Sequence, residues 1–94
     1  MPANLYRERM VLSGRVQGVG FRFFTCRVAE KYPVTGYVKN LPGGEVEVVA
    51  EGEQPSVEAF LREVAQGPGY SLIKGVKSLV EPATGSFQAF GVRS

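Results

Sequence analysis

A glycine-rich stretch near the N-terminus constrains the possible folds of this chain more than any other feature. It runs from Ser13 to Arg22 (SGRVQGVGFR) and joins an alternating apolar run to an amphipathic helical pattern. We therefore predict a strand, a loop and the first turn of a helix. Glycines let successive N–H groups turn inward, and a helix N-terminus adds unpaired N–H groups and the positive end of its dipole. This combination indicates a cradle for one small oxyanion such as phosphate, with Arg22 as a fixed charge beside it.

Two nucleotide-binding signatures do not fit this loop. No Gly-Lys-Ser/Thr sequence ends it, as a P-loop requires, and Phe23 occupies the third glycine position of the dinucleotide fingerprint. From the physics of the loop alone, a tight turn with a solvent-exposed Arg22 is as good an interpretation as an anion site.

Two motifs together resemble the acylphosphatase family. The string Gly14–Arg22 resembles one signature of that family, and Gly36–Val48 (GYVKNLPGGEVEV) resembles the other. With the chain length and element order, the resemblance covers nearly all of residues 1–94, which we predict to form one acylphosphatase-like domain. The family usually carries Asp or Asn where this chain has Gly43, a turn position.

The resemblance implies roles for individual residues. Arg22 matches the phosphate-binding arginine of the family, and Asn40 matches its water-orienting asparagine. Without the second motif, a turn-forming side chain would be the better interpretation of Asn40. The predicted phosphate contacts, made mainly by backbone N–H groups, are those of Arg15, Val16, Gln17, Gly18, Val19, Gly20 and Arg22.

The composition excludes several routes for handling a phosphoryl group. The chain has no His and no Asp, so neither a phosphohistidine nor an aspartyl phosphate can form, and an Asp-based metal cluster is impossible. Cys26 lacks a following arginine at the short spacing of a cysteine-phosphatase loop, and we interpret it as a packing residue or surface thiol. We therefore predict that water is the nucleophile and that no metal or other cofactor takes part.

The absence of a strong base selects a substrate class. An amide such as that of Asn40 is no general base at neutral pH, so the substrate needs a good leaving group. An ester must expel an alkoxide, close in basicity to hydroxide, and water has a pKa of about 15.7. An acyl phosphate expels a carboxylate whose conjugate acid has a pKa of about 4. The predicted function is hydrolysis of acyl phosphates to carboxylate and inorganic phosphate.

Hydrophobic periodicity along the chain predicts an α+β fold of the ferredoxin-like split βαβ type. Two helices should cover one face of a mostly antiparallel sheet with strand order 4-1-3-2 and a short terminal strand at an edge. We expect the third strand to be half-buried, with its glutamates facing water, and we expect Ser56 to cap the second helix or Pro55 to start it. The expected strands are 5–13, 34–41, 45–51, 72–80 and 87–92, and the expected helices are 21–31 and 55–66.

The remaining expectations concern the surroundings of the protein. The net charge is +2, no apolar run approaches a membrane span, and Met1–Asn4 does not begin a signal peptide. A single cysteine fits a reducing cytoplasm, and we expect a monomer that acts on small molecules rather than nucleic acid. The alternative is a non-catalytic anion- or RNA-binding module. A domain detached from a longer carbamoyl-transferring maturation protein is a second alternative, which the short termini disfavour.

Overall fold

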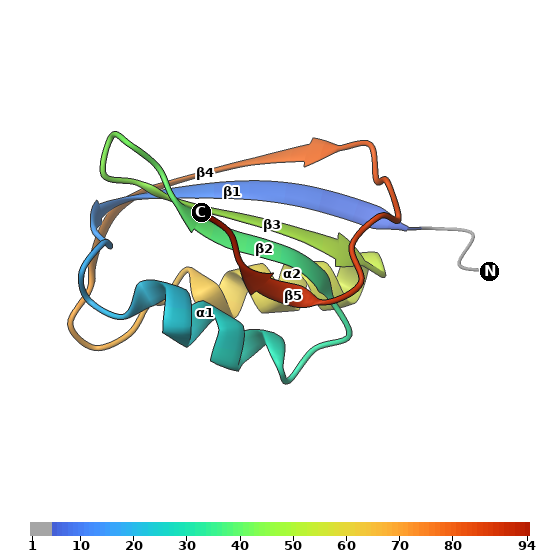
Figure 1. Cartoon of the computed structure of the whole chain (residues 1–94), viewed down its shortest axis with the longest axis horizontal. Helices are drawn as coiled ribbons and strands as arrows, with labels where there is room; N and C mark the ends of the chain where they lie inside the picture. The colour runs from blue at the N-terminus through green and yellow to red at the C-terminus, as the bar shows by residue number, and fades with distance from the viewer. Residues whose placement is uncertain (1–4) are drawn as a thin grey trace.

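The computed structural model describes residues 5–94, which form a five-stranded sheet with two helices on one face (Figure 1). The strand order is β4-β1-β3-β2-β5; all neighbouring strands are antiparallel except β2 and β5, which are parallel. The predicted fold class and strand order are therefore confirmed. The elements are β1 (Tyr6–Arg15), α1 (Phe21–Ala29), β2 (Thr35–Asn40), β3 (Val46–Gly52), α2 (Gln54–Val64), β4 (Leu72–Glu81) and β5 (Phe90–Val92).

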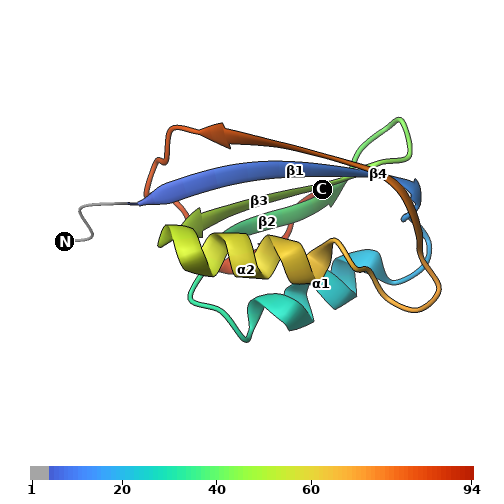
Figure 2. The ribbon, with the colours of Figure 1, turned by 180° about the vertical axis from the view of Figure 1, so that it is seen from behind.

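The core lies between the sheet and the two helices, which lie side by side on the same face in both views (Figure 2). Alternate residues of each strand face the helices, as the period of a β-strand requires. The apolar periodicity of the sequence predicts that Met10 and Leu12 share one face of β1, that Phe21 and Val28 share one stripe of α1, and that Val57, Phe60 and Val64 share one stripe of α2. The burial of all these residues confirms the predicted faces. Fully or nearly fully buried residues on this side are Met10, Leu12, Val38, Val46, Val48 and Ala50 from the sheet, with Phe21, Val28, Val57, Phe60 and Val64 from the helices.

The opposite face of β3 is buried as well, so the expectation of a half-buried strand is wrong. Glu51 is 1% exposed and Glu47 is 7% exposed. Arginines of the neighbouring strand β1 neutralise both carboxylates: Arg7 lies 3.0 Å from Glu51, and Arg9 forms an ion pair with Glu47. Because each buried charge is paired, this polar face tolerates exclusion from water.

The segment between β4 and β5, residues 82–89, crosses from one edge of the sheet to the other and covers part of this outer face (Figure 1). The N–H groups of Thr84 and Gly85 donate to Glu51, and the ring of Phe87 packs edge-to-face on Tyr37 at 5.9 Å. This packing draws Phe87 away from the sheet edge. The last strand therefore begins at Phe90 rather than at residue 87.

Local chain chemistry sets where the elements near the loop begin and end. A register shift between Ser13 and Gly14 interrupts the pairing of β1 with β4, which continues to Arg15 opposite Leu72. A Cβ at Gly14 would clash with the carbonyl oxygen of Leu72. Only glycine fits this close approach. At α2, Pro55 lies in the first turn, but Ser56 is not the N-cap, which is Glu53. No helix within residues 5–94 is long and apolar enough to cross a membrane.

Candidate active site

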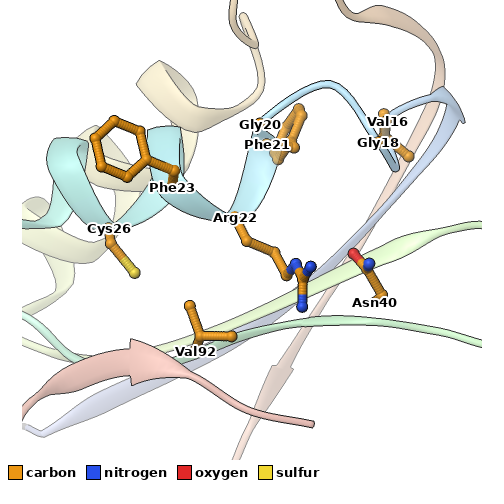
Figure 3. A pocket seen from close by; sticks show the side chains of 9 residues that line it. All are labelled: Val16, Gly18, Gly20, Phe21, Arg22, Phe23, Cys26, Asn40 and Val92. Carbon is orange, nitrogen blue, oxygen red and sulfur yellow. The ribbon is translucent and has the colours of Figure 1, made fainter.

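A depression of about 580 Å³ opens where the loop after β1 meets the start of α1, the end of β2 and strand β5 (Figure 3). Three segments that are distant in sequence therefore contribute to one concave surface, as is usual for a small-molecule site. Its lining residues are Val16, Gly18, Gly20, Phe21, Arg22, Phe23, Cys26, Asn40 and Val92.

Arg22 and Asn40 reach this depression from different elements. Arg22 lies in the first turn of α1, and Asn40 is the last residue of β2. Asn40 follows the buried Val38 by two positions, so the pleat of the strand turns both side chains toward the helices. In Figure 3 the guanidinium of Arg22 extends from α1 toward the carboxamide of Asn40. Within residues 5–94, neither side chain forms an ion pair or a hydrogen bond, so both are available to a ligand.

The backbone of the loop offers further donors. The N–H groups of residues 16–22 donate to no protein acceptor in the part of the chain described here. Gly18 and Gly20 have φ angles of +74° and +78°, left-handed conformations that glycine adopts without strain. No acidic residue lies in the first turn of α1, and no carboxylate lines the depression. The site therefore combines unpaired N–H dipoles, the positive end of a helix and one arginine, an environment that favours an anion.

Gln17 connects the loop to the hairpin between β2 and β3. Its side-chain NH₂ group donates to the carbonyl oxygens of Leu41 and Glu45, each at 2.8 Å. The N–H of Leu41 donates to the same carbonyl oxygen of Glu45, so these hydrogen bonds lie together where β2 and β3 enter the turn of the hairpin. Because Leu41 directly follows Asn40, the side-chain amide of Gln17 fixes the glycine-rich loop after β1 relative to the end of β2.

The predicted site residues divide into two groups. Val16, Gly18, Gly20, Arg22 and Asn40 line the depression. The side chains of the other three do not line it: Arg15 is exposed at the end of β1, Gln17 faces the hairpin, and Val19 packs against the core. Their phosphate contacts are predicted to come mainly from backbone N–H groups, and this stays a prediction.

Sequence reasoning did not assign Phe21, Phe23, Cys26 or Val92 to the site. A signal existed for Cys26, because it follows Arg22 by four residues and such pairs share one face of a helix. Val92 could not be found in this way. It reaches the site because β5 pairs in parallel with β2, with Val92 opposite Val38. Burial and the nearby Glu30 raise the pKa of the Cys26 thiol, so the neutral thiol dominates at physiological pH.

Comparison with known proteins identifies the family. A sequence model of the acylphosphatase family matches residues 8–92. The chain belongs to the acylphosphatase family. An acylphosphatase of Rubrobacter xylanophilus is 46% identical over 93% of this chain and 79% of its own length. An acylphosphatase of Archaeoglobus fulgidus is 50% identical over 70% of this chain and 74% of its own length.

Solved structures agree with this assignment. The crystal structure of an acylphosphatase from Bacillus subtilis superposes with a TM-score of 0.89 at 32% identity, covering 97% of this chain and all of that one. The chain is also similar to part of full-length HypF, with a TM-score of 0.84 at 28% identity over 97% of this chain and 12% of that one. The predicted family and enzyme class, an acylphosphatase, are therefore confirmed, and an acylphosphatase acts on small-molecule phosphates.

Proposed function

We propose that the depression between the start of α1 and the end of β2 is the active site, and that Arg22 and Asn40 are its catalytic side chains. The reaction is hydrolysis of the carboxyl–phosphate bond of an acyl phosphate. The observation that carries this proposal is that both side chains line the same depression as a loop with unpaired N–H groups. This chemistry needs a set of hydrogen-bond donors that bind an anion, together with an amide that orients a water molecule.

The loop and Arg22 would bind the phosphoryl group. Phosphoryl transfer has a loose transition state, and catalysis depends mainly on positioning and on stabilising charge at the equatorial oxygens. N–H groups of residues 16–22 supply fixed donors, and the planar guanidinium of Arg22 can contact two oxygens at once. These donors are held by the fold before the substrate arrives, so little reorganisation accompanies the reaction.

Asn40 would hold the attacking water. Its carboxamide offers one acceptor and two donors, enough to orient a water against the phosphorus. The water oxygen forms a bond to phosphorus as the bond from phosphorus to the acyl oxygen breaks. An acyl phosphate dianion and water thus give a carboxylate and dihydrogen phosphate, with the second water proton carried by a phosphate oxygen. No covalent intermediate is required.

The donor set of the chain fits neither a metal nor a strong general acid. The sequence contains no His and no Asp, and no carboxylate lines the depression among the residues described. A carboxylate leaves without protonation, because its conjugate acid has a pKa of about 4. We therefore infer an active site formed by a single chain, without a metal, that hydrolyses activated anhydrides but not simple phosphate monoesters. A monomer in a reducing compartment fits this proposal.

The experiment is an assay of benzoyl phosphate hydrolysis by four variants and the unmodified chain. We expect Arg22→Ala to lower turnover about 10³-fold, as loss of an arginine clamp on a phosphoryl group does. Asn40→Ala should lower it roughly 10²- to 10³-fold, as loss of one oriented polar group does. The controls are Arg62→Ala and Gln66→Ala, which remove an exposed arginine and an exposed amide outside the depression.

The outcomes separate the proposal from its alternatives. Equal activity of Arg22→Ala and the unmodified chain, with both folded, would overturn the assignment of the site. Activity that disappears with EDTA and returns with Mg²⁺ would overturn the metal-free mechanism. Salt-sensitive RNA binding together with no hydrolysis of any acyl phosphate would favour a binding module instead.

A further inference from the structure

A second hollow lies on the outer face of the sheet, on the side away from both helices. Its volume is about 390 Å³, which is within the range of sites that hold a small molecule. None of its lining residues lines the depression proposed as the active site. These residues are Val11, Ser13, Glu45, Gly75, Val76 and Lys77.

Three neighbouring strands place these residues. Val11 and Ser13 lie in β1 on the same face as Arg9, because alternate residues of a strand share a face. Lys77 lies opposite Val11 in β4, and Glu45 directly precedes β3, on the other side of β1. In Figure 1 and in Figure 2 the turn of the β2–β3 hairpin rises on the side of the sheet opposite the helices. The hairpin therefore forms one wall of the hollow, β1 its floor and β4 the other wall.

The floor of the hollow is open because residue 75 has no side chain. Gly75 lies opposite Ser13 in the interior of β4, and its φ is not positive, so the backbone does not require glycine there. A Cβ built on Gly75 would lie 2.7 Å from the hydroxyl oxygen of Ser13. The hydrogen bond from this hydroxyl to the carbonyl oxygen of Gly75 is long, 3.4 Å, so the hydroxyl can turn toward a ligand. Glycine in the interior of a strand often marks a place that a ligand approaches closely.

The hollow carries one charge of each sign. The side chains of Glu45 and Lys77 both line it, and within residues 5–94 neither forms an ion pair or a hydrogen bond. The neighbouring carboxylates of Glu47 and Glu81 are instead paired with Arg9. A cation alone would meet the charge of Lys77, and an anion alone would meet that of Glu45. The site is therefore suited to a molecule that carries both charges.

The distance between the two charged residues sets the length of such a molecule. Adjacent strands are about 4.8 Å apart and β1 lies between β3 and β4, so the backbones that carry Glu45 and Lys77 are about 10 Å apart. We propose that this hollow binds a small zwitterion whose ammonium and carboxylate groups are separated by several carbons. Glu45 accepts hydrogen bonds from the ammonium group, and Lys77 and Ser13 donate to the carboxylate. Val11 and Val76 contact the hydrocarbon between the two groups.

A titration with 4-aminobutyrate, followed by nitrogen-15 NMR, tests this proposal without reference to hydrolysis. Saturating inorganic phosphate is present throughout, so that the carboxylate of the probe does not occupy the proposed active site. We expect saturable shifts at residues 11–13 and 75–77 and little change at residues 16–22. Absence of saturable shifts, or shifts confined to residues 16–22, would overturn the proposal.

Probes that carry one charge measure the contribution of each side of the hollow. Butyrate and butylammonium should each bind at least about fivefold more weakly than 4-aminobutyrate, the scale of one partly exposed ion pair. Glycine should be equally weak, because its two charges are too close to reach both Glu45 and Lys77. A smaller difference for butyrate or butylammonium would overturn the requirement for both charges, and equal affinity for glycine would overturn the proposed spacing.

A matched pair of lysine variants locates the site. Lys77→Gln should lower the affinity for 4-aminobutyrate about fivefold and leave kcat for benzoyl phosphate unchanged, because Lys77 lies outside the active-site depression. Lys74→Gln removes another exposed lysine of β4, outside the hollow, and should leave the affinity unchanged. Equal affinities of the two variants would overturn the assignment of Lys77.

Gly75→Ala tests the hollow without changing a charge. The backbone at this position accepts alanine, and the hydroxyl of Ser13 can rotate away from the new Cβ. The methyl group would occupy the floor, so we expect the affinity for 4-aminobutyrate to fall about tenfold or more. Gly69→Ala adds the same group in open space and should leave the affinity unchanged. Full affinity of folded Gly75→Ala for 4-aminobutyrate would overturn the proposed site.

Discussion

The side-chain amide of Gln17 donates a hydrogen bond of 2.8 Å to the backbone carbonyl oxygen of Leu41, the residue that follows Asn40. This contact joins the two segments that the proposed mechanism needs in register: the loop to which we assign the phosphoryl group and the strand end to which we assign the water. The loop and the strand end are not adjacent in the chain, because the loop follows β1 and Asn40 precedes the turn of the β2–β3 hairpin. Gln17 is therefore a positioning residue in the proposed site.

Gln17→Leu keeps the approximate size of the side chain and removes both of its donors. We expect kcat for benzoyl phosphate to fall about ten- to a hundredfold, because small displacements of reacting groups are costly. The inhibition constant of inorganic phosphate should change less than threefold. The loop N–H groups and Arg22 belong to one continuous segment of the chain, so their relative positions do not depend on Gln17. Steady-state kinetics with phosphate as a competitive inhibitor measures both quantities.

A double-mutant cycle decides whether Gln17 acts through Asn40. In a chain that already carries Asn40→Ala, the added change Gln17→Leu should lower kcat less than threefold, since the water is no longer held. Gln66→Leu, at an exposed glutamine after α2, is the control and should leave kcat unchanged. Equal costs of Gln17→Leu in both backgrounds would show that the contact only stabilises the fold.

Gly20→Ala tests whether the loop conformation itself matters. Gly20 is the N-cap of α1 with φ of +78°, and a Cβ there would meet no atom within 4 Å. Any penalty therefore comes from the left-handed backbone and not from a clash, and is expected to be about 1–2 kcal/mol. The thermal midpoint should fall by roughly 4–8 °C per kcal/mol, and phosphate affinity should fall with it.

Gly69→Ala is the matched control for this loop variant. Gly69 also has open space around its Cα, but its backbone is outside the left-handed region. Alanine there should leave the midpoint unchanged or raise it slightly, because it restricts the unfolded chain. Equal midpoints for Gly20→Ala and Gly69→Ala in a thermal scan would contradict the assigned role of the loop conformation.

Local patterns were sufficient to predict the fold. Alternation at Met10 and Leu12 and the helical stripe that includes Phe21 and Val28 identify core faces, and these faces are confirmed. Two helices with one apolar face each need the same side of one sheet, and the strand order followed from the split βαβ topology that this arrangement and the element order indicate. Element ends were less accurate because they depend on contacts between distant residues, as the start of β5 at Phe90 illustrates.

Long-range pairing explains what could not be predicted. The alternation of polar and apolar residues in β3 places Glu51 on the face expected to meet solvent. Its partners, Arg7 and the backbone N–H of Thr84, are distant in sequence, so no local pattern predicts that they enclose it. The same applies to the site. Arg22 and Asn40 were predicted from motifs, whereas the apolar contribution of Val92 depends on the parallel pairing of β5 with β2.

The buried carboxylate of Glu51 should make the free energy of unfolding depend on pH. Burial alone would raise its pKa, but hydrogen bonds from the N–H of Thr84 and from Arg7 outweigh burial and hold the pKa below its ordinary value. The unfolded chain therefore binds this proton first as the pH falls. The stabilisation is complete above the unfolded pKa of about 4.3 and is lost as the pH falls through the lower folded value.

Glu51→Gln keeps the shape of the side chain and removes its charge. We expect a loss of about 2–3 kcal/mol at pH 7, because hydrogen bonds to a charged group are replaced by weaker ones. The difference from the unmodified chain should shrink as the pH is lowered toward about 2. Glu30→Gln, at an exposed site 3.8 Å from Arg27, should change stability little at any pH. Urea unfolding at several pH values measures both, and a difference independent of pH would contradict this account.

Cys26 should react slowly although its side chain lines an open depression. Burial and the negative charge of Glu30 raise the pKa of the thiol, so the thiolate, the reactive form, is scarcer at neutral pH than in a free thiol. We expect iodoacetamide at pH 7.5 to alkylate Cys26 severalfold more slowly than glutathione, and the rate to rise as the pH increases toward the raised pKa. Chain unfolded in guanidinium chloride is the control and should react at the glutathione rate. Mass spectrometry measures the extent of alkylation over time. If the folded chain is alkylated as fast as glutathione, the thiolate is accessible and Cys26 must be considered again as a nucleophile.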